Sequence, residues 1–104
     1  LFVAGQIGWN AQAQFESDDL VAQARQALAN VCAVLAAAGG GPQHLVRLTW
    51  YVTDRQAWLA RGREVGAVYR ELVGHYGVAM SAVEVSALME ARAQVEVEAT
   101  AVLP

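Results

Sequence analysis

Two runs of alternating apolar and polar residues near the C-terminus constrain the fold of this chain most strongly. They are AMSAVEV at 79–85 and QVEVEATAV at 94–102. Successive side chains of a strand point to opposite faces of a sheet, so this period of two indicates two strands, each with one dry face. In the second run, Glu96 and Glu98 lie opposite the valines. A carboxylate in mid-strand is costly to bury unpaired, so its face must be wet or must meet a partner.

Further strands and helices precede these two runs. Residues 1–8 and 45–53 read as strands, the second with clear alternation. Residues 17–38 carry apolar side chains at spacings of three and four, which predicts a helix capped by Ser17 or Asp18 and stopped by glycines 39–41. A second helix follows Asp54, with an apolar stripe that ends at Tyr76. The predicted order is strand, helix, strand, helix, strand, strand.

The second predicted helix contains two glycines, Gly62 and Gly66. Each costs about 1 kcal/mol relative to alanine in a helix interior, so we expect another element to pack closely there. Trp58 begins the apolar stripe of this helix, and Trp50 lies on the apolar side of the strand before it. Both tryptophans are therefore expected in the core.

Two helices can cover only one face of a four-stranded sheet, so the other face is expected to be open in a single chain. With 56% hydrophobic and 16% charged residues, this 104-residue chain is more apolar than one small domain needs. We therefore predict that the open face packs against other copies of the chain. The alternation assigns these residues to it: Arg47, Thr49, Tyr51, Met80, Ala82, Glu84, Glu96 and Glu98.

Charge and composition argue against several classes of protein. The net charge is −3, and every one of the seven basic residues is arginine, so no lysine-rich surface for nucleic acid is expected. The longest uncharged run, residues 26–43, contains Asn30 and Pro42 and does not read as a membrane span. The single Cys32 lies at helical spacing among apolar residues, as a buried small hydrophobe would, and fits a reducing cytoplasm.

Several short stretches, in their order and spacing, resemble one known family. They are AGQI at 4–7, Gln23 with QALAN at 26–30, LTWYVTD at 48–54, AMSAVEV at 79–85 and VEVEA at 95–99. The chain resembles the reactive-intermediate deaminase (Rid) family, also called the YjgF or L-PSP family, over nearly its whole length. The resemblance implies one α+β domain over residues 1–104, with a chorismate-mutase-like mixed sheet and two helices on one face.

The resemblance implies a homotrimer. In such a trimer the sheets line a central barrel, and the ligand sites lie in the clefts between subunits. The family usually begins with one strand more than this chain shows. The chain starts at Leu1 without a methionine, already inside a strand-like run, so we expect a preceding segment. We expect no cofactor. Neither His44 nor His75 has a partner at metal-ligand spacing, so we expect no metal.

The resemblance also implies an activity and a site. Family enzymes hydrolyse reactive enamine and imine intermediates to a keto acid and ammonia. The water-holding glutamate of the family falls at Glu96, its carboxylate-binding arginine at Met80 and a pocket serine at Ala4. The asparagine of some members falls at Gly66. The residues expected to bind substrate are Ala4, Gly5, Ala79, Met80 and Ser81.

Met80 is the largest departure from the family pattern. A substrate carboxylate is best held by the two parallel hydrogen bonds of a guanidinium, whereas a thioether offers only a soft apolar contact. Losing about 1.5–3 kcal/mol per charge-assisted hydrogen bond lowers affinity about tenfold to a hundredfold. We therefore expect altered specificity, away from small anionic 2-imino acids.

The residues leave several alternatives open. Glu96 either orients a water molecule or is satisfied by backbone N–H groups or by Arg47 at the trimer interface. Glu84 could join the same acidic network. Arg47 either neutralises those acids or serves as a displaced anion anchor. Arg92 is either solvated or reaches a cleft between subunits, and Trp9 and Phe15 either rim a pocket or pack ordinarily.

At the level of function, the leading interpretation is a cytoplasmic trimer that binds a small metabolite and hydrolyses an enamine or imine. A second interpretation is a binding or regulatory module with the same cleft and no turnover. A third, endoribonuclease, follows only from a family label. The acidic charge and the absence of an aromatic and basic stripe argue against it.

Overall fold

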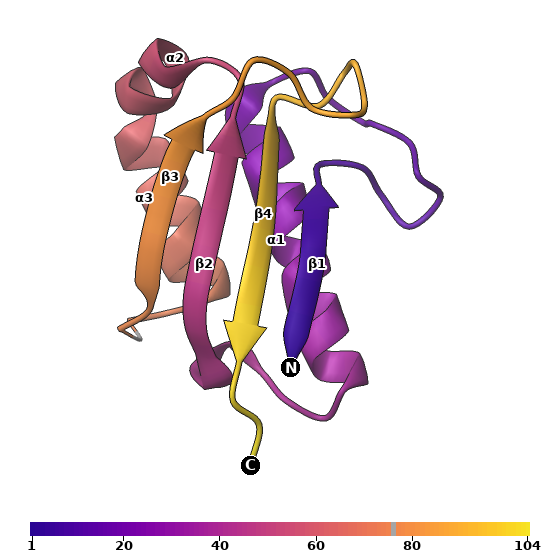
Figure 1. Cartoon of the computed structure of the whole chain (residues 1–104), viewed down its shortest axis with the longest axis vertical. Helices are drawn as coiled ribbons and strands as arrows, with labels where there is room; N and C mark the ends of the chain where they lie inside the picture. The colour runs from indigo at the N-terminus through magenta and orange to yellow at the C-terminus, as the bar shows by residue number, and fades with distance from the viewer. Residues whose placement is uncertain (76) are drawn as a thin grey trace.

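A four-stranded sheet with helices on one face makes up the computed structural model, which describes residues 1–75 and 77–104 (Figure 1). The strands are β1 (Phe2–Ile7), β2 (Leu45–Val52), β3 (Ala79–Glu84) and β4 (Val95–Ala101). The helices are α1 (Leu20–Ala37), a short 3₁₀ helix η1 (Pro42–His44), α2 (Arg55–Ala60) and α3 (Gly62–Leu72). The strand positions and the α+β class are confirmed.

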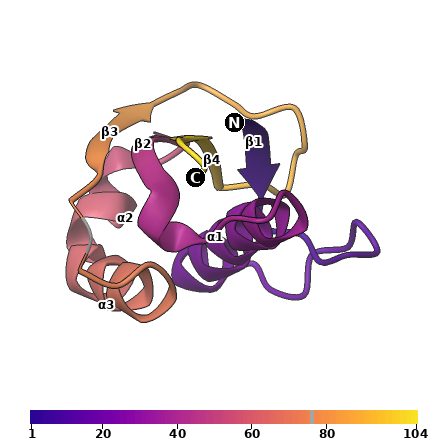
Figure 2. The same cartoon turned by 90° about the horizontal axis from the view of Figure 1, so that it is seen from below.

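The sheet is mixed, with strand order β1-β4-β2-β3. β4 pairs antiparallel with both β1 and β2, whereas β3 pairs parallel with β2 at one edge. Figure 2 shows α1 and α3 together on one side of the sheet, as predicted. Because β4 is central, its buried positions alternate strictly with less buried ones, which is the pattern seen in its sequence.

The core lies between the sheet and α1. Leu28, Val31 and Leu35 of α1 are fully buried against Leu48 and Val97 of the central strands. By length and composition alone α1 could cross a membrane, but its buried side packs against this sheet, as in the core helix of a globular domain.

Two tryptophans extend the core toward the second helical segment. Trp50 is 2% exposed, and its ring lies 5.3 Å from that of Trp58, tilted by 45°. Trp58 is partly buried and packs against the core cluster. The prediction that both tryptophans belong to the core is confirmed.

The start of α1 differs by one or two residues from the sequence prediction. Asp19, rather than Ser17 or Asp18, caps the helix, because its Oδ2 accepts from the backbone N–H of Ala22 at 3.0 Å. Ser17 instead accepts a hydrogen bond from the backbone N–H of Asp19 through its Oγ. At the other end the chain leaves the helix through Gly39, whose φ of +84° favours glycine.

The second predicted helix is interrupted at Arg61. Asp54 caps α2 as predicted, accepting from the backbone N–H of Ala57 at 3.0 Å. Arg61 then binds Asp19 at 2.9 Å and Glu64 at 2.6 Å, which holds the break between α2 and α3 against the start of α1. Tyr76, the expected end of the stripe, lies outside the described residues.

The two glycines of this segment are not sites of close packing, so that prediction was wrong. Gly62 begins α3 instead of lying in a helix interior, and a Cβ built on it would meet no atom within 4 Å. A Cβ built on Gly66 would meet only the Arg70 guanidinium, at the ordinary contact distance of 3.4 Å.

A buried glutamine joins α1 to the loops on either side. Gln23 is 1% exposed, and its amide nitrogen donates to the backbone carbonyls of Ser17 and Arg92 at 3.1 and 3.0 Å. Its amide oxygen accepts from the backbone N–H of Gln94 at 2.8 Å. All three bonds are therefore made to main chain, which fixes the entry into β4 relative to the start of α1.

Candidate functional site

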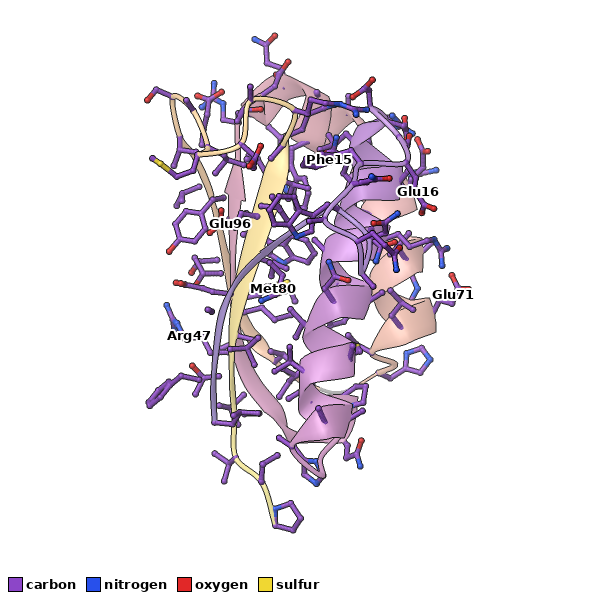
Figure 3. The ribbon with its side chains drawn as sticks, turned by 90° about the vertical axis from the view of Figure 1, so that its right-hand side faces the viewer. Phe15, Glu16, Arg47, Glu71, Met80 and Glu96 are labelled. Carbon is purple, nitrogen blue, oxygen red and sulfur yellow. The ribbon has the colours of Figure 1, made fainter. Side chains whose placement is uncertain are left out.

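The open face of the sheet carries the acids predicted for it. Figure 3 shows Arg47 and Glu96 on the side of the sheet away from the helices. Tyr51 lies opposite Glu96 in the β2–β4 register, and Thr49 lies opposite Glu98. The assignment of these five residues to the open face is confirmed.

The Glu96 side chain lies against the backbone of Gly5 in β1. A Cβ on Gly5 would collide with Oε2 of the Glu96 side chain, so the carboxylate occupies space that only glycine leaves free. The Glu96 side chain is half-buried, and among residues 1–75 and 77–104 it accepts no hydrogen bond. Its carboxylate oxygens are thus positioned by packing and remain free to accept protons from a ligand or from water.

Glu98 has a different environment two residues along the same strand. Its Oε1 accepts a hydrogen bond from the Tyr51 hydroxyl at 2.7 Å. This bond, with partial burial and the charges of Glu98 and Glu96, raises the pKa of Tyr51. The phenol therefore stays protonated and donates to Glu98, so that of these two acids Glu96 is the one without a donor among the described residues.

Arg47 does not neutralise these acids within one chain. It lines a hollow of about 470 Å³ on the open face, together with Phe2, Glu98 and Thr100. The four ion pairs between described residues all involve other arginines. A contact of Arg47 with these acids across a trimer interface stays a prediction.

Three residues predicted on the open face lie on the other side of the sheet. In the parallel register Met80, Ala82 and Glu84 pair with Leu48, Trp50 and Val52, which are the core-facing residues of β2. Figure 3 accordingly shows Met80 between the sheet and the helices. Their predicted placement was wrong because alternation fixes which residues share a face but not which face meets the helices.

Glu84 also has a specific partner on that side. Its Oε1 accepts from the backbone N–H of Arg55 at 2.9 Å, at the start of α2. A carboxylate satisfies an unpaired amide and the positive end of the helix there. The alternative in which Glu84 joins an acidic network with Glu96 and Glu98 is therefore excluded within the chain.

Met80 faces a cavity between β3 and α3. The cavity holds about 250 Å³, and its walls are mainly apolar: Trp50, Trp58, Val65, Tyr69 and Met80, with Arg70 beside them. Burial raises the pKa of the Tyr69 phenol. Sequence reasoning missed Arg70; the signal was its position four residues after Gly66, on the same side of the helix.

The site residues predicted from the sequence divide into two groups. Glu96, Gly5 and Ala4 lie at the β1–β4 side of the sheet. Ala79, Met80 and Ser81 lie on β3, with β2 between them and β4. Since Met80 also faces away from Glu96, one chain does not bring the two groups into a single pocket.

The remaining candidate residues have structural partners. Arg92 pairs with Asp18 at 2.9 Å and lies 5.4 Å from the centre of the Phe15 ring, which in turn packs against Trp9. Cys32 is half-buried, less so than predicted, and this burial raises the pKa of its thiol. Within the described part of the chain, no three His, Cys, Asp or Glu side chains gather to hold a metal ion.

Comparison with known proteins identifies the family. The family model described as Endoribonuclease L-PSP matches residues 1–103. This chain belongs to the Rid/L-PSP family. Protein DfrA of Myxococcus xanthus is 37% identical over 102 residues, which are 97% of this chain and 74% of that protein.

Solved structures of Rid proteins share the fold. A Rid family protein of unknown function from Yersinia pestis, YyfB, has a TM-score of 0.89 at 36% identity, covering 99% of this chain and 77% of that chain. The Escherichia coli protein TdcF, solved with bound serine, has a TM-score of 0.83 at 29% identity, covering 99% and 80%. The chain is thus a Rid-type protein, a class that includes small-molecule binders.

Proposed function

We propose that this Rid protein forms a homotrimer, binds a small metabolite in the clefts between subunits and hydrolyses an enamine or imine there. One observation carries the proposal: the Glu96 carboxylate is held against Gly5 and has no hydrogen-bond donor among residues 1–75 and 77–104. A carboxylate with free acceptor capacity, fixed by packing, suits a group that orients and deprotonates water.

Assembly would unite the two groups of site residues. Glu96 and Met80 lie on opposite sides of one sheet, with β2 between their strands. A cleft that contains both therefore needs the Glu96 side of one copy and the Met80 side of another. A symmetric ring of copies supplies that arrangement at every interface.

The open face has the apolar surface that such packing requires. Phe2 is 87% exposed, Met89 is 100% exposed and Val83 is 44% exposed, all near the acids of the open face or on its edge strand. Side chains of this kind in contact with water favour association between copies. This supports the proposed trimer, which we expect as a threefold mass in light scattering.

The proposed reaction is a balanced hydrolysis. An enamine first tautomerises to the imine by gaining a proton at carbon. The oxygen of a water molecule then bonds to the imine carbon, and Glu96 takes the proton that this water loses. The nitrogen takes up both protons of that water, the first from Glu96 and the second as the new hydroxyl becomes the carbonyl. The C–N bond then breaks, and ammonia and the keto compound are released. Serine bound to TdcF supports a ligand of amino-acid size and chemistry.

The activity is tested by generating imines with an amino-acid oxidase and following their decay in the presence of the protein. We expect faster decay and a matching release of ammonia. If no amino-acid-derived imine decays faster than in buffer, the proposed deaminase activity is wrong. The proposed location is the cytoplasm, with no nucleic acid or membrane partner.

Met80 favours a second candidate, a binding or regulatory module without turnover. A thioether in place of the implied guanidinium would weaken the hold on an anionic substrate. Thermal shift against a panel of metabolites, followed by product analysis of every hit, separates the two candidates. Stabilisation without product would support the binding module.

Met80→Arg is expected to increase affinity for pyruvate, the simplest 2-keto acid product, by about tenfold to a hundredfold. The new guanidinium can form two parallel hydrogen bonds with the carboxylate. Isothermal titration measures the change. Leu59→Arg is the control, because Leu59 is 69% exposed on α2. The substitution adds the same charge away from the cavity. Equal gains in both variants would show a general charge effect and contradict the prediction.

A further inference from the structure

We infer that the cavity beside Met80 binds an amphipathic anion, with an aromatic or branched apolar body against the tryptophans and a carboxylate on Arg70. This inference rests on the proposed function and names the substrate class of the same site. The compounds that fit are keto acids, and the imines that yield them, with a large apolar side chain.

The walls of the cavity select an apolar body. Trp50 and Trp58 form a tilted pair with ring centres 5.3 Å apart, and Val65, Tyr69 and Met80 complete the lining. The volume of about 250 Å³ is below the range of about 300–1,000 Å³ that holds drug-sized ligands. A single ring or a branched aliphatic chain with a short polar tail fits this space. The Met80 side chain is 46% exposed and can adapt to either.

Arg70 supplies a positive charge at the edge of these walls. It is exposed, lines the cavity, and makes no ion pair with any residue of the described ranges. Three other arginines do make such pairs: Arg25 with Glu71, Arg61 with Asp19 and Glu64, and Arg92 with Asp18. The Arg70 guanidinium therefore keeps all of its donors for a ligand.

The guanidinium lies beside Gly66 of the same helix. Gly66 precedes Arg70 by one turn of α3, and Nη1 of Arg70 lies 3.4 Å from the point where a Cβ on Gly66 would be. The cation thus lies on the helix wall of the cavity, opposite the strand that carries Met80.

Cation and walls together determine which ligands bind. A small keto acid such as pyruvate reaches Arg70 but leaves the aromatic walls unfilled. A neutral aromatic compound fills the walls but leaves the guanidinium without an anion. Only a ligand with both parts gains apolar burial and a charge-assisted hydrogen bond at once.

Tryptophan emission tests the inference with three probes: phenylpyruvate, its methyl ester and pyruvate. The Trp9→Phe background limits emission to the two tryptophans of the cavity wall. We expect phenylpyruvate to quench emission and to bind about tenfold more tightly than either other probe. Arg70→Gln should remove that advantage while the affinity for the ester stays the same, and Arg70→Lys should restore part of it.

Arg63→Gln is the matched control, because Arg63 is exposed on the same helix and does not line the cavity. It should leave all three affinities unchanged. The inference is overturned if Arg70→Gln binds phenylpyruvate as the parent does, if the ester binds as well as the acid, or if phenylpyruvate does not bind because a neighbouring subunit fills the cavity.

The outcomes separate this inference from the proposed reaction. Arg70-dependent binding of phenylpyruvate without any imine hydrolysis would support Arg70 as the carboxylate-binding residue and contradict the proposed deaminase activity. Hydrolysis that is fastest with small aliphatic imines and insensitive to Arg70→Gln would support the deaminase activity and contradict the carboxylate-binding role of Arg70.

Discussion

Replacing Glu96 with glutamine is expected to lower the rate of imine hydrolysis by about 10²-fold to 10⁴-fold, the usual contribution of a positioned general base. Glutamine has nearly the same shape, so it can still lie against Gly5, but its amide cannot take a proton from water. Because binding contacts elsewhere in the cleft remain, product affinity should change far less than kcat. Stopped-flow decay of an enzymatically generated imine, with titration of the keto acid product, measures both quantities.

Glu98→Gln provides the matched control on the same strand and face. Its amide oxygen can still accept the hydrogen bond from the Tyr51 hydroxyl, which is 2.7 Å long in the native chain. We expect this variant to keep most of the activity. If Glu98→Gln is as damaging as Glu96→Gln, the effect belongs to the charge of the open face as a whole, and the assignment of Glu96 as the base is wrong.

Gln23→Glu is expected to destabilise the fold by about 3–5 kcal/mol at neutral pH, the usual cost of a buried charge without a partner. The new oxygen would replace the amide nitrogen that donates to the carbonyls of Ser17 and Arg92. At 1% exposure no solvent compensates the repulsion between the carboxylate and these two carbonyl oxygens. Urea unfolding followed by circular dichroism measures the loss.

The pH dependence of this variant distinguishes a buried charge from a packing defect. Burial and the two carbonyls raise the pKa of the introduced carboxyl in the folded chain, so the folded state holds the proton more tightly than the unfolded state does. The penalty should therefore shrink as the pH falls toward about 4.3, the pKa of glutamate in an unfolded chain. Gln56→Glu, at an exposed position of α2, should be nearly neutral. A pH-independent loss in Gln23→Glu would contradict the charge argument.

Much of the fold could be predicted because its signals are local. β4 is central and buried on alternate positions, so its sequence shows the period directly. The helix start was misplaced by one or two residues because Ser17, Asp18 and Asp19 are all good capping residues. The break at Arg61 has only a weak local signal, Gly62, and the ion pair between Arg61 and Asp19 joins elements far apart in the chain.

The candidate site was less predictable, for reasons of topology. β3 is an edge strand whose six residues are all exposed, so its burial pattern gives no indication of which side faces the helices. Only the parallel register with β2 shows that Met80 shares the face of Leu48. The free acceptor capacity of Glu96 and the cation at Arg70 likewise depend on tertiary contacts, which alternation and spacing do not encode.

The Gln23 amide has a consequence for engineering this protein. It holds the main chain of Gln94 from the helix side of the sheet, and Glu96 follows two residues later. The direction of the Glu96 carboxylate is therefore set partly from the helix side of the sheet, by a group outside the proposed cleft. Mutant libraries confined to the proposed subunit cleft would leave this alignment intact, whereas changes near the start of α1 would disturb it while leaving the proposed ligand contacts in place.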